Sequence, residues 1–258
     1  MVSTENLFSL KGKTAIVTGG TSGIGRNVAD YLASAGANIA IVGTRKTAAL
    51  DIAKQIQSDY SVSTVGIACD VTNPKAVDEM IDEVSKTIGT ADVLFNNAGI
   101  NISGDAIDMP FDDWKKVLDV NVNGVFLTAR AFAKKLIAEG KPGSVINMAS
   151  ISASIINLPQ SQTAYNTSKA GVRHMTKSLA IEWVKHGIRV NSVSPGYVWT
   201  EMNQIVPEKI TKVWMDYTPL KRFAQPDEIA GAVIFFASDA SSYCTGSDLL
   251  IDGGFTCL

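Results

Sequence analysis

Short apolar runs alternate along the chain with longer segments whose apolar residues recur every three to four positions. The runs predict seven buried strands, at residues 13–18, 38–43, 63–68, 91–95, 144–148, 188–193 and 248–251. The longer segments predict helices at residues 26–36, 47–60, 73–88, 111–139, 163–186 and 227–238. Strands that are apolar on both faces and separated by helices indicate a parallel sheet covered on both sides. With right-handed crossovers, this pattern predicts an α/β, doubly wound fold.

The chain shows no linker, repeat or low-complexity segment that would divide it. Residues 195–226, rich in proline, tryptophan and methionine, form the one break in composition and predict a loop with small helices. We interpret this stretch as a substrate-loop insertion and not as a domain boundary. The sequence therefore predicts a single domain over residues 1–258.

Composition and charge exclude several classes of function. The 258 residues are 46% hydrophobic and 19% charged, which suits an ordinary packed core, and a net charge of -2 gives no basic surface for nucleic acid. No apolar run approaches the roughly 20 residues that span a bilayer, and residues 1–13 lack the apolar core of a secretory signal. We therefore expect a cytoplasmic protein with no nucleic-acid partner and no membrane partner.

Cysteine and histidine are too few and too scattered to suggest a metal site. Cys69, Cys244 and Cys257 lack CxxC spacing, and their odd number fits a reducing compartment without a disulfide framework. His174 and His186 belong to no cluster with zinc-ligand spacing, and we interpret them as structural or surface residues. The sequence thus predicts neither a metal site nor a Ser-His-Asp hydrolase.

A glycine-rich turn, Gly19–Gly25, joins the first strand to the first helix. Its glycines allow a tight turn and let a pyrophosphate approach the N-terminus of the helix, where free N–H groups and the helix dipole favour an anion. This strand–turn–helix context predicts nucleotide binding. In a doubly wound sheet the ligand lies beyond the carboxyl ends of the strands. Other notable residues also follow strand ends, namely Asp70, Asn97 to Gly99, Ser150, Pro195 and Gly196.

Tyr165 and Lys169 lie four residues apart in the predicted helix 163–186, so their side chains share one face. The phenol has an ordinary pKa near 10 and is a poor base at neutral pH, but a nearby lysine cation lowers that pKa. The pair can therefore move a proton on or off an alcohol oxygen. The same spacing is common on exposed helix surfaces, so the pair gains its meaning from the rest of the chain.

Four motifs in this order resemble those of the short-chain dehydrogenase/reductase family, and the resemblance spans nearly the whole chain. They are residues 18–25 (TGGTSGIG), 96–99 (NNAG), 165–169 (YNTSK), and 194–196 (SPG) with Thr200. The resemblance implies a single-domain Rossmann-type fold, a nicotinamide cofactor, and hydride transfer between that cofactor and a carbonyl or alcohol. It also implies a homotetramer.

The resemblance further implies roles for four catalytic residues. Tyr165 is expected to be the general acid/base, and Lys169 to lower its pKa and to bind the nicotinamide ribose. Ser150 is expected to polarise the substrate oxygen. Asn121 is expected to hold a water that links Lys169 to solvent in a proton relay.

Two of these roles leave an alternative residue open. The spacing from Ser150 to Tyr165 is slightly longer than is common in the family, so Ser152 remains an alternative catalytic serine. Asn123 competes less strongly with Asn121. The cofactor is expected to contact Gly19, Thr21, Ser22, Gly23, Ile24, Gly25, Arg45, Asp70, Val71, Asn97, Ala98, Gly99, Tyr165, Lys169, Pro195, Gly196, Val198 and Thr200.

The end of the second strand indicates which nicotinamide cofactor is bound. An acidic residue there would hold the ribose 2′-hydroxyl of NAD, whereas an arginine would meet the 2′-phosphate of NADP. The chain has no acid there and carries Arg45 and Lys46, whose donors suit a phosphate. We therefore expect NADP(H) rather than NAD(H), with Asp70 and the backbone of Val71 at the adenine.

Fold and catalytic residues do not fix the substrate. Amide and hydroxyl side chains expected around the pocket suit a polyhydroxylated compound, and the stretch 150–177 resembles the family's sugar-alcohol and ketose reductases, which act on sorbose, mannitol or arabinitol. Alternatives are a 3-oxoacyl-thioester reductase, a gluconate dehydrogenase, a reductase of bulky apolar ketones, and, from another class, a non-catalytic NADP-binding sensor. The expected substrate contacts are Ser150, Ser152, Gln160 and Tyr165, with Asn101, Ile102, Ile156, Gln162 and the segment 197–217 lining the pocket.

Overall fold

One parallel sheet organises the chain. The computed structural model describes residues 4–258, so the first three residues of the stretch 1–13, in which we expect no secretory signal, lie outside the described residues. Seven strands pair in the order β3-β2-β1-β4-β5-β6-β7. They are β1 (Thr14–Thr18), β2 (Asn38–Gly43), β3 (Thr64–Ala68), β4 (Val93–Asn96), β5 (Gly143–Met148), β6 (Ile188–Pro195) and β7 (Asp248–Ile251). The predicted α/β doubly wound sheet is confirmed, and so is each of its strands.

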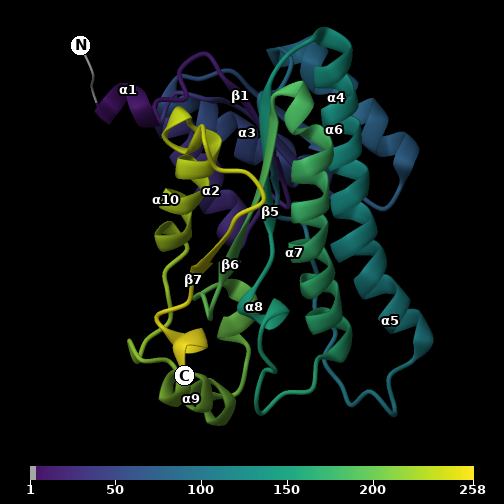
Figure 1. Cartoon of the computed structure of the whole chain (residues 1–258), viewed down its shortest axis with the longest axis vertical. Helices are drawn as coiled ribbons and strands as arrows, with labels where there is room; N and C mark the ends of the chain where they lie inside the picture. The colour runs from purple at the N-terminus through teal and green to yellow at the C-terminus, as the bar shows by residue number, and fades with distance from the viewer. Residues whose placement is uncertain (1–3) are drawn as a thin grey trace.

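Helices cover both faces of the sheet. They are α1 (Thr4–Phe8), α2 (Gly23–Ser34), α3 (Lys46–Tyr60), α4 (Pro74–Ile88), α5 (Phe111–Leu118), α6 (Val125–Glu139), α7 (Thr163–Trp183), α8 (Glu201–Gln204), α9 (Glu208–Tyr217) and α10 (Asp227–Ala237). The helices α2, α3 and α10 pack on one face, and α4, α6 and α7 pack on the other (Figure 1). The segment 195–226 contains the two short helices α8 and α9, as its composition predicted, and Figure 1 shows them at one end of the sheet.

Neighbouring residues of the central strands serve two different cores. Phe95 of β4 belongs to the cluster under α2 and α10, whereas Leu94 belongs to the cluster under α6 and α7, and both are fully buried. This follows from the strand geometry, because successive side chains point to opposite faces. Burying a side chain of this size stabilises the folded protein by roughly 1.5–3 kcal/mol. Because both faces of the central strands are buried, apolar residues occupy consecutive positions along them.

The predicted helix 111–139 is helical throughout, but it is not α-helical over its whole length. Between α5 and α6 the residues Asp119–Gly124 (η1) form a π-helical turn. The side chain of Asn121, in this turn, is fully buried and accepts a hydrogen bond from the backbone N–H of Ile100 (2.8 Å). It donates to the carbonyl of Ile100 (2.9 Å) and to Oγ of Ser168 (3.0 Å). The wider turn therefore ties α7 and the β4 loop to the middle of a long helix, and π-turns of this kind are frequent at functional sites.

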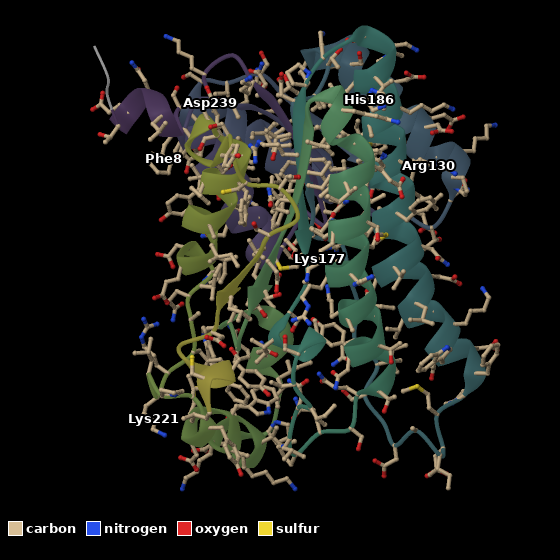
Figure 2. The ribbon with its side chains drawn as sticks, in the orientation of Figure 1. Phe8, Arg130, Lys177, His186, Lys221 and Asp239 are labelled. Carbon is tan, nitrogen blue, oxygen red and sulfur yellow. The ribbon has the colours of Figure 1, made fainter. Side chains whose placement is uncertain are left out.

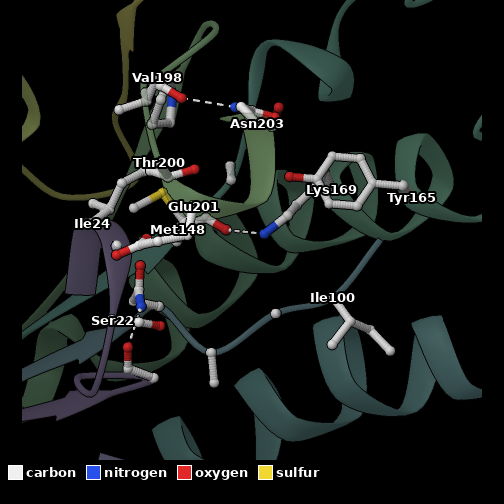
Figure 3. Close-up of a pocket in the computed structure, with 18 of the residues that line it drawn as sticks. Ser22, Ile24, Ile100, Met148, Tyr165, Lys169, Val198, Thr200, Glu201 and Asn203 are labelled. Carbon is white, nitrogen blue, oxygen red and sulfur yellow. Dashed lines mark hydrogen bonds between the residues drawn. The ribbon is translucent and has the colours of Figure 1, made fainter. Parts of the chain in front are cut away.

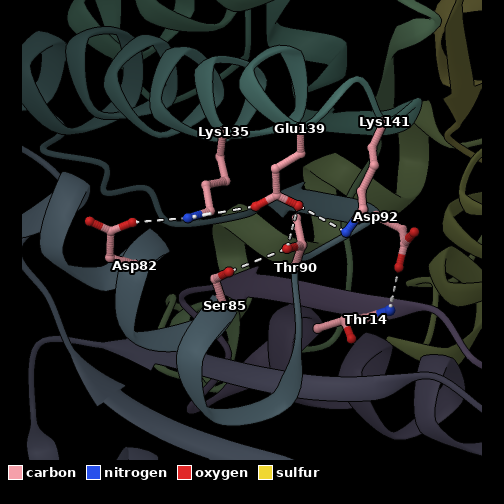
Figure 4. Close-up of polar contacts among 8 residues, drawn as sticks. All are labelled: Thr14, Asp82, Ser85, Thr90, Asp92, Lys135, Glu139 and Lys141. Atoms are coloured by element: carbon pink, nitrogen blue, oxygen red, sulfur yellow. Dashed lines mark hydrogen bonds and ion pairs between the residues drawn. The ribbon is translucent and has the colours of Figure 1, made fainter.

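A polar cluster closes the amino ends of the strands, away from α8 and α9. Glu139 of α6 accepts hydrogen bonds from Thr90 and Lys141, both at 2.8 Å, and these hold the pKa of its carboxyl below its usual range (Figure 4). Lys135 joins Asp82 of α4 at 3.3 Å. Exposed ion pairs of this kind contribute little to stability, about 0–1 kcal/mol each. The pair Lys135–Asp82 links α6 to α4 at this end of the molecule.

The histidines take no part in the candidate site described below. His174 and His186 are both exposed, as the sequence predicted. Figure 2 shows His186 at the end of the molecule opposite to α8 and α9. Within residues 4–258, no helix combines the length and the apolar character needed to cross a membrane.

Candidate active site

A cavity of about 330 Å³ opens at the carboxyl ends of the central strands (Figure 3). It brings together residues that lie far apart in the sequence, from the glycine-rich turn to the segment after β6. Most of the predicted cofactor residues line it, namely Gly19, Thr21, Ser22, Gly23, Ile24, Asn97, Ala98, Gly99, Tyr165, Lys169, Pro195, Gly196, Val198 and Thr200.

The glycine-rich turn is built to receive an anion. Gly19 and Gly23 have φ values of +63° and +54°, a conformation that favours glycine. A Cβ atom on Gly19 would also lie 2.8 Å from Nδ2 of Asn97. Ser22, at the N-cap of α2, makes no side-chain capping bond, which leaves the N–H groups of the first turn for a ligand. These residues fit the pyrophosphate of a dinucleotide.

Gly25 and Asn97 serve to hold the turn in place. Gly25 was expected at the cofactor, but it lies under the turn and does not line the cavity, and a Cβ there would lie 2.4 Å from both Gly19 O and Asn97 Nδ2. Asn97 donates from Nδ2 to the carbonyls of Thr18 and Gly19, each at 3.1 Å. Thr18 returns the contact, since its Oγ1 accepts from the N–H groups of Asn97 and Ala98 at 3.1 Å. Thr18 belongs to the motif 18–25, but its place in that motif does not reveal this positioning role.

Three other expected cofactor residues lie outside this cavity, beyond β2 and β3. Arg45 is exposed at the start of α3, and its guanidinium has no hydrogen-bond or ion-pair partner in the described part of the chain. Asp70 is exposed, and its Oδ1 accepts from the N–H (2.9 Å) and the hydroxyl (2.8 Å) of Thr72. Val71 is buried and packs against Gly124. Because β2 neighbours β1 and β3 neighbours β2 in the sheet, these residues follow the same carboxyl edge that the cavity occupies.

Burial is the main influence on the pKa values of Tyr165 and Lys169. The ammonium of Lys169 is 3% exposed and donates to the carbonyl of Met148 at 2.7 Å (Figure 3), and burial lowers its pKa to about 8. Its Nζ lies 5.5 Å from the centre of the Tyr165 ring. Burial raises the pKa of the Tyr165 phenol above its ordinary value, while a hydrogen bond with Ser150 acts in the opposite direction. Of these two effects, burial is the larger, and the hydrogen bond with Ser150 is the one that lowers the pKa of Tyr165.

The two candidate serines occupy different places. Ser150 lines this cavity and the adjoining one described below, and it hydrogen-bonds Tyr165. Ser152 lines only the adjoining cavity. It accepts a hydrogen bond from Ser150 (3.1 Å) and donates one to Oδ1 of Asn157 (2.8 Å). Of the two, Ser150 is therefore the serine beside the phenol.

The two candidate asparagines are also separated by the structure. Asn123 is exposed and donates to Asp119 at 2.8 Å, at the surface of the π-turn. Asn121 is buried close to Lys169, since a Cβ placed on Gly99 would lie 3.3 Å from Asn121 Oδ1 and 3.6 Å from Lys169 Nζ. Asn121 is therefore the asparagine near Lys169, although it lines neither this cavity nor the adjoining one.

A second cavity, of about 500 Å³, adjoins the first and shares Ser150, Tyr165, Gly196 and Asn203 with it. All four expected substrate contacts line it, as do Asn101 and Gln162, whereas Ile102 and Ile156 do not. Among the described residues of its lining, none is charged. Its walls are formed by Asn101, Ser103, Ser150, Ile151, Ser152, Asn157, Gln160, Gln162, Tyr165, Gly196, Tyr197, Asn203, Ile205, Val206, Pro207, Ile210 and Trp214.

Sequence reasoning did not name Ser103 or Asn157 as residues of the second cavity, and it included Asn203 only as part of the segment 197–217. Asn157 lies in the short insertion before Tyr165, and that insertion was the one available signal for it. Asn203 of α8 lies at the junction of the cavities and donates to the carbonyl of Val198 at 2.8 Å (Figure 3), and no motif marks it. Within the described residues, no group of three or more His, Cys, Asp or Glu side chains could hold a metal ion.

Known proteins share this architecture and sequence. A family model described as enoyl-(acyl carrier protein) reductase matches residues 19–256. The sorbose reductase of Candida albicans is 42% identical over 254 residues, which cover 98% of this chain and 90% of that protein. The NADP-dependent mannitol dehydrogenase of Alternaria alternata is also 42% identical over 254 residues, covering 97% of this chain and 95% of that protein.

The three-dimensional comparison agrees with the sequence comparison. The crystal structure of a short-chain type dehydrogenase/reductase from Mycobacterium marinum superposes with a TM-score of 0.94 at 42% identity, covering 99% of this chain and 100% of that one. Matches of this identity along nearly the whole chain, together with the tyrosine, lysine and serine gathered at one cavity, lead to one conclusion: the chain is an oxidoreductase that belongs to the short-chain dehydrogenase/reductase family.

Proposed function

We propose that this oxidoreductase uses NADP(H) to reduce a ketose or, in the opposite direction, to oxidise the corresponding polyol. The observation that carries the proposal is the second cavity, whose described lining offers amides and hydroxyls but no charged side chain, next to Ser150 and Tyr165. A neutral, polyhydroxylated substrate finds partners there. The carboxylate of gluconate, or the phosphate of an acyl carrier, finds no cation to pair with. The substrates named for the sorbose and mannitol relatives support the same class.

In this proposal the chain's own residues handle the proton. The nicotinamide, when bound, supplies or accepts the hydride. Burial keeps the Tyr165 phenol protonated at neutral pH, which suits donation to the oxygen of a carbonyl as it becomes an alcohol. In the structure Ser150 donates its one hydrogen to Ser152, and we assign it to turn this hydrogen to the same substrate oxygen and stabilise the charge that develops there.

Lys169 and Asn121 supply the route for the next proton. The buried ammonium of Lys169 uses one donor on Met148, and we assign its remaining donors to the ribose hydroxyls of the cofactor. Its pKa of about 8 lets it exchange a proton near neutral pH. The Asn121 side chain is fully engaged by Ile100 and Ser168. A relay water at this residue is therefore assigned to the main-chain carbonyl of Asn121.

The preference for NADP(H) is assigned to Arg45, with Asp70 and Val71 at the adenine. The unpaired guanidinium of Arg45 suits a 2′-phosphate. Replacing Arg45 with Asp should raise KM for NADPH about 10- to 100-fold, the value of a charge-assisted hydrogen bond. KM for NADH should stay the same or fall. Lys54→Asp, on the exposed surface of the same helix, is the charge-matched control. An unchanged preference for NADPH in Arg45→Asp would remove this assignment.

We also propose a homotetramer and a cytoplasmic location. The edge strand β7 carries Leu249 and Leu250, which are 39% and 43% exposed. Apolar side chains on an unpaired edge strand suit burial against another copy of the chain. Light scattering gives the test, since a monomeric mass would contradict the assembly. The three free cysteines fit a reducing compartment.

A substrate panel tests the function. NADPH or NADH absorbance is followed with L-sorbose and other ketoses, with a keto-gluconate, and with a 3-oxoacyl thioester. We expect turnover of ketoses, with NADPH preferred. Turnover confined to the keto-gluconate or the thioester would assign one of those activities instead. NADPH binding without turnover of any compound, unchanged in Tyr165→Phe, would favour the sensor.

A further inference from the structure

Tyr197, which follows Pro195 and Gly196 at the end of β6, has a rigidly held ring in the wall of the second cavity. Trp214 of α9 stacks on the ring, with centroids 4.2 Å apart and planes at 5°. Phe255, near the C-terminus, contacts it edge-on at 5.6 Å. Aromatic contacts on its face and its edge restrict the ring, so the position of its hydroxyl is set by the fold.

The Tyr197 hydroxyl accepts a hydrogen bond from an amide, and a second amide acts on its titration. Asn157 donates from Nδ2 to the hydroxyl at 3.2 Å, and Gln160 and Asn157 both oppose the rise that burial causes in the pKa of the phenol. Both amides are oriented by their other ends. Oδ1 of Asn157 accepts from Ser152 at 2.8 Å, and Oε1 of Gln160 accepts from Nε1 of Trp214 at 2.9 Å. Each amide therefore presents its NH2 group to Tyr197.

This arrangement leaves the hydrogen of the Tyr197 hydroxyl unused. A phenol has one hydrogen to donate and accepts at its oxygen, and Asn157 donates to that oxygen. In the described part of the chain, no acceptor for this hydrogen is found within hydrogen-bond distance. Because Tyr197 lines the second cavity, its hydrogen is available to a ligand there.

We propose that Tyr197 donates its hydroxyl hydrogen to a substrate hydroxyl remote from the reacting carbon and thereby selects polyhydroxylated ketones over simple ones. The inference rests on the proposed function and deepens it. Hydrogen bonds run from Ser150 through Ser152 and Asn157 to Tyr197. These bonds fix the position of Ser150, beside the reacting oxygen, relative to that of Tyr197, beside the remote hydroxyl. A substrate without the remote hydroxyl has nothing to offer Tyr197, and a site built in this way discriminates against it.

Tyr197→Phe tests the inference, with Tyr217→Phe as the matched control. Tyr217 belongs to the same aromatic cluster but does not line the second cavity. The probes are L-sorbose, which carries remote hydroxyls, and dihydroxyacetone, which does not and serves as substrate or as competitor. We expect Tyr197→Phe to raise KM for L-sorbose about tenfold, with kcat within about twofold. KM or the inhibition constant for dihydroxyacetone should be unchanged, and Tyr217→Phe should match the wild type throughout.

Two results would overturn the inference. One is an equal rise in KM, or in the inhibition constant, for both probes. The other is a lower kcat with an unchanged KM for L-sorbose. Either result would show that Tyr197 only supports Asn157 and Gln160. A thermal melt of each variant separates these outcomes from a failure to fold. A wild type that turns over no ketose would remove the proposed function and this inference together, whereas failure of the inference alone appears only with an active wild type.

Discussion

Replacing Gly25 with alanine should damage the glycine-rich turn although Gly25 does not line the cofactor cavity. The new Cβ would lie 2.4 Å from Gly19 O and 2.4 Å from Asn97 Nδ2. Gly19 O belongs to the backbone and cannot rotate away. The Asn97 amide can move only by giving up its bonds to Thr18 and Gly19. Overpacking costs about 1–3 kcal/mol, and each hydrogen bond lost costs about 0.5–1.5 kcal/mol. The better helix propensity of alanine returns up to about 1 kcal/mol.

The expected net effect is a loss of about 3 kcal/mol, or a fall in Tm of about 6–12 °C for a domain of this size. Calorimetry gives Tm, and NADPH fluorescence gives Kd, which should rise because the turn that receives the pyrophosphate is displaced. Gly231→Ala is the control, since Gly231 lies within α10 and a Cβ there meets nothing within 4 Å. It should leave Tm unchanged or raise it. A Gly25→Ala variant with wild-type Tm and wild-type Kd would refute the reasoning.

Two further changes test the buried polar groups of the site. In Lys169→Met the stability of the cofactor-free protein should lose a pH-dependent contribution. Burial holds the folded pKa of Lys169 at about 8 against a reference of 10.5, so the unfolded chain binds more protons between these values and stability rises with pH. Urea titrations give the free energy of unfolding at pH 7 and at pH 9.5. Between these pH values the wild type should gain about 2 kcal/mol in this free energy relative to Lys169→Met. The same difference between the two proteins at both pH values would contradict the assignment. Asn121→Ala should lower the free energy of unfolding by about 2–4 kcal/mol in the same assay, because it leaves the N–H and C=O of Ile100 without their partner. It should also slow NADPH oxidation. An unaltered urea midpoint would show that these bonds do not hold the π-turn.

The sheet could be predicted from the sequence because its central strands are buried on both faces. Runs such as residues 38–43 stay apolar without helical periodicity, and a glycine or polar turn bounds each of them. The same rule placed Gly19, Ser150 and Pro195 at one edge, since parallel strands end together. Within the cofactor cavity, position along the chain was therefore a good guide to position in space.

The π-turn at Asn121 and the packing role of Gly25 could not be predicted in this way. Both depend on contacts with distant segments, Ile100 and Ser168 in the first case and Asn97 in the second. No local pattern in residues 111–139 predicts the π-turn, because the segments before and after it both keep helical periodicity. The balance of charge effects on Tyr165 likewise required the burial of the phenol, which spacing to Lys169 does not reveal.

The hydrogen bonds of the second cavity also join distant segments, so local sequence patterns do not predict them. Gln160 was expected to contact the substrate, and it does line the cavity, but its amide oxygen is taken by Trp214 of α9. Asn157 and Tyr197 meet there although 40 residues separate them. Hydrogen-bond direction in such a network depends on every neighbour at once, so it emerges only from the folded arrangement.

The central claim is that Tyr165 delivers the proton in a hydride transfer that uses NADPH. The most direct measurement follows NADPH absorbance with L-sorbose for the wild type and Tyr165→Phe, with Kd for NADPH measured on the same samples. Loss of the phenol should lower kcat by about 10²- to 10⁴-fold, the usual contribution of a positioned acid or base, while Kd stays within about twofold. Turnover by Tyr165→Phe at the wild-type rate would contradict the account.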